Sequence, residues 1–148
     1  MNLTTNIVNA CNNTFPMFGF NTEMISEVTE ENLNSAEEIN ILIGLSNGAQ
    51  GNIIISFNKN TALGIISKMM GGMEVNEIDN MGKSALGEMA NMVMGTTISS
   101  ISADSIIELS PPSIATGKDM YIMISNVPSQ KLEFILDGKK MYISYAVQ

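Results

Sequence analysis

The chain has 148 residues, the usual size of one globular domain, so we predict a single domain over residues 1–148. It contains no histidine and no tryptophan, and its seven basic residues are all lysines. These absences exclude Ser-His-Asp and Cys-His catalysis, histidine-ligated zinc or haem iron, and an arginine finger supplied by this chain. The single cysteine, Cys11, has no partner for a disulfide within the chain, which fits a reducing compartment.

The net charge of −8 makes several partners improbable. Binding to a nucleic-acid backbone needs clustered basic residues, and an anionic membrane repels an acidic protein. A secretory signal begins with a basic segment, whereas the first lysine here is Lys59, and no apolar run approaches the roughly 18 residues that cross a bilayer. We therefore expect a cytoplasmic protein with neither a nucleic acid nor a membrane as partner.

The first half of the chain predicts a helix, strands and a second helix. Apolar residues between 7 and 15 have near-helical spacing that ends at Pro16, and residues 24–30 alternate as in a strand. Residues 39–45 and 51–57 flank Asn47-Gly48, the dipeptide of a tight hairpin turn. A polar segment from Asn58 to Asn60 then caps a predicted helix that stops at Gly71-Gly72.

The second half predicts one long helix followed by strands. The helical pattern runs from about residue 77 to 102, and a strand at 106–109 and a Pro111-Pro112 loop come next. Residues 120–125, 132–136 and 141–147 alternate, and Asp137-Gly138 joins the last two segments as a second hairpin. This order predicts an α+β fold in which helices cover a largely antiparallel sheet.

Gly82-Lys83-Ser84 looks like the end of a phosphate-binding P-loop. The first glycine of that motif falls at position 77, which is Glu77, and no strand precedes the segment. We therefore interpret these residues as the beginning of the long helix and not as a nucleotide site.

Four residues of the predicted long helix form one polar stripe. At about 100° per residue, Ser84, Glu88, Asn91 and Gly95 fall within roughly 60° of one another. The opposite side is apolar and can anchor the helix on the sheet. Its residues are Leu86, Met89, Ala90, Val93 and Thr97. The stripe is therefore expected to face outward, with Glu88 and Asn91 able to reach one target.

A carboxylate and a carboxamide can support phosphoryl hydrolysis without histidine, arginine or a bound metal. The Asn91 amide can both donate to and accept from a water molecule, and an ionised Glu88 can pair with a lysine of a partner. The loose transition state asks for positioning and charge neutralisation more than for a strong base. A metal and the phosphate would come with the partner. An ordinary amphipathic helix with a polar outer side explains the same pattern, and geometry alone leaves both interpretations open.

The motif resembles that of the CheC, CheX and FliY family of chemotaxis phosphatases, which is Ser or Asp, three residues, Glu, two residues and Asn, with a proline downstream. Here it reads Ser84, Glu88 and Asn91, followed by Pro111 or Pro112. The Asn-Ile-Ile-Ile-Ser-Phe hairpin strand, the Met-Met-Gly-Gly break and the Ser-Pro-Pro loop extend the resemblance along nearly the whole chain. CheC-type proteins usually carry two motif copies, and the single copy here is similar to the CheX type.

The resemblance implies a CheC-like fold, a homodimer with joined sheets, and hydrolysis of the phosphoaspartate of a CheY-type response regulator. It implies that Glu88 pairs with the regulator's lysine and that Asn91 orients the attacking water. Ser84 and Gly95 are small residues of the same stripe, which would let another molecule come close, so we expect them in the partner-binding surface. Magnesium is expected on the regulator, with no metal or cofactor bound by this chain. Two alternatives remain: a non-catalytic binding or scaffold domain related to flagellar switch components, and the same activity serving a regulator outside chemotaxis.

Overall fold

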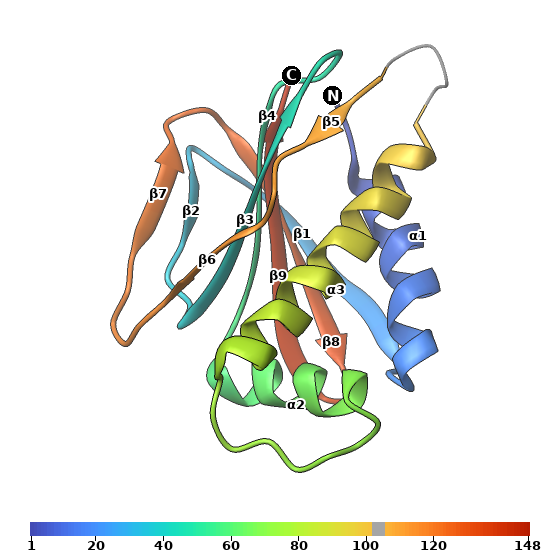
Figure 1. Cartoon of the computed structure of the whole chain (residues 1–148). Helices are drawn as coiled ribbons and strands as arrows, with labels where there is room; N and C mark the ends of the chain where they lie inside the picture. Colours follow the sequence, from blue (N-terminus) through green and yellow to red (C-terminus); the bar gives the residue numbers. More distant parts are fainter. Residues whose placement is uncertain (102–105) are drawn as a thin grey trace.

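The computed structural model describes residues 1–101 and 106–148, and it shows helices packed on an antiparallel sheet (Figure 1). The helices are α1 (Thr4–Thr14), α2 (Lys59–Met69) and α3 (Asn80–Ser99), with a 3-10 turn, η1 (Phe15–Phe18), after α1. The strands are β1 (Thr22–Glu30), β2 (Leu33–Ser35), β3 (Ile39–Ser46), β4 (Gly51–Phe57), β5 (Glu108–Leu109), β6 (Ser113–Thr116), β7 (Ile122–Ser125), β8 (Ser129–Leu136) and β9 (Lys139–Val147).

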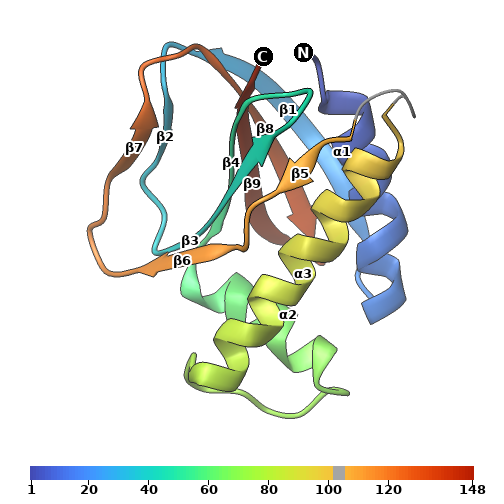
Figure 2. The ribbon, with the colours of Figure 1, turned by 45° about the horizontal axis from the view of Figure 1, so that its top comes forward.

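The main sheet has seven antiparallel strands. Its order is β1-β8-β9-β4-β3-β5, and β6 also pairs with β3 beside β5. Strands β2 and β7 form a separate two-stranded sheet on the side of the main sheet away from α1 and α3 (Figure 2). The expected α+β fold, with a largely antiparallel sheet covered by helices, is confirmed.

Both predicted hairpin turns are present. Asn47 and Gly48 have φ angles of 57° and 99° between β3 and β4, and Asp137 and Gly138 have φ angles of 47° and 81° between β8 and β9. Positive φ is costly for most residues but is tolerated by Asn, Asp and Gly, so these dipeptides set the register of the strand pairs that they join.

The core lies between the helices and one face of the main sheet. Helix α3 packs against α1 and α2, and fully buried isoleucines of β3 and β4 face it across the core. Leu33 of β2, Ile54 of β4 and Ala146 of β9 form a small second cluster on the opposite face. Alternating residues of a strand point to opposite faces, so the sheet is apolar on the helix side and partly covered on the other.

The long helix is shorter than predicted. It begins at Asn80 because the Asp79 carboxylate accepts a hydrogen bond from the Gly82 N–H at 2.8 Å and caps its first turn. It ends at Ser99, and the predicted end at position 102 lies outside the described residues.

Four short strands differ from the prediction. The segment 120–125 contains β7, which pairs with β2 instead of joining the main sheet, and the prediction missed β2 and β6 altogether. The strand predicted at 106–109 is reduced to Glu108–Leu109. Strands β2, β5 and β6 are two to four residues long, too short for period-two alternation to stand out. The alternation of the segment that contains β7 was visible, but it does not show which strand β7 pairs with.

Within the described part of the chain, no helix combines the length and the apolar character that crossing a bilayer requires.

Candidate functional site

Helix α3 separates its outer and inner faces as the periodicity predicts. Ser84, Glu88, Asn91 and Gly95 are all exposed. The five residues predicted for the inner side are all buried, each with 0% of its surface accessible: Leu86, Met89, Ala90, Val93 and Thr97. The helix is thus fixed on the core by one side and presents the polar stripe to solvent by the other.

Three of the four stripe residues line one shallow, open groove of about 420 Å³. Ser84, Glu88 and Asn91 form one wall of it, and Pro112 and Ile114, at the start of β6, form the other. Gly95 lies one helical turn beyond Asn91 on the same exposed face and does not line the groove. The structure therefore brings Ser84, Glu88 and Asn91 together and leaves Gly95 at the margin.

Pro112, and not Pro111, is the proline of the groove. A Cβ atom placed on Gly87 would lie 3.4 Å from Pro112 Cγ, at the lower limit of ordinary van der Waals contact. Pro112 therefore packs directly beside Gly87 of α3, between Ser84 and Asn91. Pro111 is not among the residues that line the groove.

Sequence reasoning missed four further residues of the groove wall or assigned them no role: Lys83, Gly87, Pro112 and Ile114. Gly87 carried a usable signal, because it lies three residues after Ser84 and four before Asn91, a spacing that places it beside the stripe. For Pro112 the family resemblance indicated a downstream proline without choosing between Pro111 and Pro112. Ile114 carried no signal, because a segment that includes residues 102–105 separates it from the helix.

The side chains of Glu88 and Asn91 are available to a visiting molecule. Among the described residues, neither makes a side-chain hydrogen bond or an ion pair with the rest of the chain. An exposed carboxylate can accept hydrogen bonds from an ammonium group, and an exposed carboxamide can orient a water molecule through its oxygen and its NH₂ group. The groove thus presents a carboxylate that can bind a cationic group and a carboxamide that can orient a water molecule, three residues apart on one helix.

Other chemistry is not assembled at this groove. Cys11 is buried in α1, where desolvation raises the pKa of its thiol, so it is protonated and enclosed by the core. Over the ranges 1–101 and 106–148, no three His, Cys, Asp or Glu side chains are grouped so that they could hold a metal ion.

Comparisons with known proteins agree with this geometry. Residues 39–136, which include α3 and the groove, match the family model described as chemotaxis phosphatase CheX. CheY-P phosphatase CheX of Thermotoga maritima is 38% identical to this chain over 82 residues. That match covers 55% of this chain and 53% of the relative, so the chain matches about half the length of that curated relative.

Solved structures share the fold over essentially the entire chain. CheX from Desulfovibrio desulfuricans superimposes with a TM-score of 0.87, at 19% identity and full coverage of both chains. CheX from Borrelia burgdorferi, solved in a complex with CheY, BeF₃ and Mg²⁺, superimposes with a TM-score of 0.84 at 23% identity, and the match covers 99% of this chain and 98% of that one. With its antiparallel sheet, its Ser84–Glu88–Asn91 groove and a family match over more than half of its length, this chain belongs to the chemotaxis phosphatase CheX family.

Proposed function

We propose that this protein hydrolyses the phosphoaspartate of a CheY-type response regulator. The observation that carries the proposal is the exposed pair of Glu88 and Asn91 in one groove of an otherwise anchored helix. Family membership supports it, as do a relative named CheY-P phosphatase and a fold neighbour solved with CheY.

Asn91 is proposed to orient the attacking water. Its amide has no useful basicity, but it can hold a water molecule in line with the phosphorus while donating or accepting a hydrogen bond. Phosphoryl transfer through a loose transition state gains most from such positioning. The exposure of Asn91 on the outer face of α3 leaves it able to enter a concave site on a partner.

Glu88 is proposed to pair with the active-site lysine of the regulator and so to set the register of the complex. Because Glu88 lies one helical turn from Asn91, a contact at Glu88 fixes where Asn91 is placed. Ser84 and Gly95 have small side chains on the same face, and we propose that they let the partner backbone approach α3 closely.

Magnesium is proposed to belong to the regulator, where it would neutralise charge on the phosphoryl oxygens. The residues of the groove include a single carboxylate, Glu88, which is too few oxygen ligands for a dedicated magnesium site of this chain.

The decisive experiment measures phosphate release from a phosphorylated CheY-type regulator with Mg²⁺, with and without this protein. Asn91→Ala should raise the activation free energy by about 3 kcal/mol, as loss of one preorganised group does, and so slow the accelerated reaction roughly a hundredfold. Binding of the regulator should change little. Asn91 is exposed and alanine favours helix, so the variant should remain folded.

A matched control is Asn60→Ala, the same substitution at an exposed position of α2 that lines a different groove. It should leave the rate unchanged. An Asn91→Ala variant that releases phosphate at the normal rate contradicts the mechanism. A wild-type protein that binds the phosphorylated regulator without accelerating release supports the alternative of a non-catalytic scaffold domain.

We also propose that the protein forms a homodimer with joined sheets. In the described part of the chain β1 pairs only with β8, so one side of this nine-residue strand is an open edge that a second copy could extend. Light scattering coupled to size-exclusion chromatography should then give twice the monomer mass of 16.0 kDa. A monomeric mass at the concentrations of the phosphatase assay contradicts this part of the proposal.

A further inference from the structure

A second hollow of about 240 Å³ lies next to the groove of Ser84, Glu88 and Asn91, called the motif groove below. Three of the seven lysines of the chain line this second hollow. It lies between the first turns of α2 and α3 and the end of β6. Lys59, Lys83 and Lys118 line it together with Glu38 and Glu77. Lys83 also lines the motif groove, so the two hollows share that residue.

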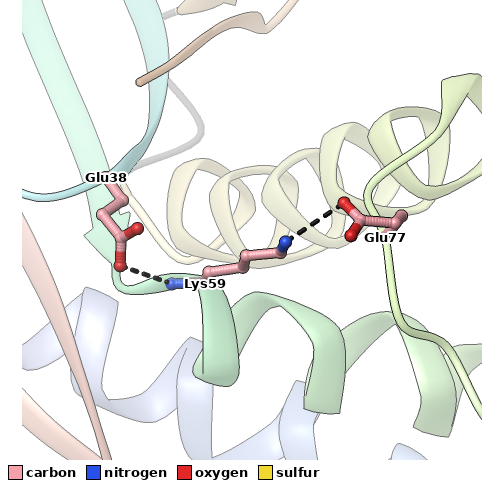
Figure 3. A network of polar contacts seen from close by, with 3 residues as sticks. All are labelled: Glu38, Lys59 and Glu77. Atoms are coloured by element: carbon pink, nitrogen blue, oxygen red, sulfur yellow. Dashed lines mark hydrogen bonds and ion pairs between the residues drawn. The ribbon is translucent and has the colours of Figure 1, made fainter. Parts of the chain in front are cut away.

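The two glutamates of this hollow are already engaged by one residue. Lys59 Nζ lies 3.1 Å from Glu77 Oε2, and the Lys59 N–H donates to Glu38 Oε1 at 3.2 Å, as Figure 3 shows. These contacts neutralise Lys59 and hold the beginning of α2. Among the described residues, Lys83 and Lys118 form no ion pair with this chain, and both are exposed. Once the Lys59–Glu77 pair cancels, the charges of Lys83, Lys118 and Glu38 leave the hollow with a net charge of +1.

The position of Lys83 is not explained by the stability of α3. Lys83 lies in the first turn of the helix, close to the positive end of the helix dipole, where a cation costs roughly 0.3–1 kcal/mol. The Asp79 carboxylate that caps this turn lies four residues before Lys83, but among the described residues the two side chains form no ion pair. Lys83 is therefore exposed, without an ion-pair partner among the described residues, and available to another molecule.

We infer that Lys83 and Lys118 dock an acidic surface of the phosphorylated regulator beside its active site. The inference rests on the proposed function, and it adds a second contact to the groove. A partner whose site holds a phosphoaspartate is locally negative, and the net charge of this chain opposes its approach. Lys83 and Lys118 place positive charge beside the groove that contains Glu88, so this surface carries positive charge at the two lysines and negative charge at Glu88. Such a pattern both attracts the partner and orients it.

The test uses a CheY-type regulator with BeF₃ and Mg²⁺ bound, called the charged regulator below, so that binding is measured without hydrolysis. We compare the wild type, Lys83→Glu combined with Lys118→Glu, and the control Lys139→Glu combined with Lys140→Glu, which makes the same total charge change at two exposed residues that do not line either hollow. At about 0.02 M salt the lysine double variant should associate with the regulator at least tenfold more slowly than the control. At about 0.5 M salt this difference in association rate should largely disappear.

Two further readouts separate docking from a catalytic or structural role. In the phosphate-release assay the double variant should raise KM and leave kcat near the wild-type value, because neither lysine contacts the reacting atoms. Lys83→Glu alone should unfold at the same temperature or slightly higher, because a carboxylate suits the first turn of α3. A loss of kcat at saturating regulator, or an association rate equal to that of the control at low salt, overturns the inference.

The outcomes also distinguish this inference from the proposed function. A wild-type protein that binds the charged regulator, with lysine variants indistinguishable from the control, contradicts the docking role alone. Lysine-dependent binding without phosphate release contradicts the catalytic role alone. If the wild type does not bind the charged regulator, both are wrong.

Discussion

The two faces of helix α3 share one backbone and differ in what they contribute. The inner face, with Leu86 and Val93 at 0% exposure, packs against α1, α2 and the sheet. The outer face exposes Glu88 and Asn91, which contact nothing else among the described residues through hydrogen bonds or ion pairs. We therefore expect that stability and the proposed activity can be changed independently on one element, because burial decides the first and the exposed groups of the proposed site decide the second.

The largest effect is expected on the inner face. Leu86→Ala removes a fully buried side chain and should lower the free energy of unfolding by roughly 3 kcal/mol, measured by urea denaturation. The control Met81→Ala removes an apolar side chain of the same helix that is 67% exposed, and its effect should stay within about 0.5 kcal/mol. The rate of phosphate release per folded molecule should be retained in both variants. If Leu86→Ala costs no more than the control, the inner face is not the anchor described here.

A smaller effect, on binding instead of stability, is expected on the outer face. Glu88→Lys reverses the charge that is proposed to meet the regulator's lysine, and it should weaken affinity for the BeF₃-charged regulator on the order of tenfold to a hundredfold. Calorimetry or fluorescence titration measures this directly, and the unfolding free energy should hardly change. Glu74→Lys, at an exposed position of a different groove, is the matched charge control. If Glu88→Lys and Glu74→Lys bind the regulator with equal affinity, Glu88 does not lie in the interface.

The smallest effect concerns Gly95, at the margin of the outer face. A Cβ atom at this position meets nothing within 4 Å, so Gly95→Gln fits the fold and should raise the unfolding free energy by roughly 0.5 kcal/mol through better helix propensity. The longer side chain should at the same time weaken regulator binding severalfold if the partner passes over Gly95. Higher stability with unchanged affinity would place Gly95 outside the contact surface and limit the site to the groove.

Local patterns were predictable because their causes lie within a few residues. The stripe of Ser84, Glu88 and Asn91 follows from helical periodicity, and the turns at Asn47-Gly48 and Asp137-Gly138 follow from the backbone freedom of those dipeptides. Helix α3 begins three residues later than the apolar pattern predicts, because the Asp79 cap and not the first apolar residue sets the start of the helix.

Contacts between distant segments were decided only by the tertiary structure. The choice of Pro112 over Pro111 depends on how the chain returns to α3 and packs beside Gly87. The pairing of β7 with β2, and the approach of Lys118 to Lys83, likewise depend on chain paths that no local pattern encodes. Periodicity shows which side of an element is buried, because the apolar residues of that side recur with the period of the helix or strand. Which segment covers that side, and which charges meet beside it, follows from the packing of the whole core.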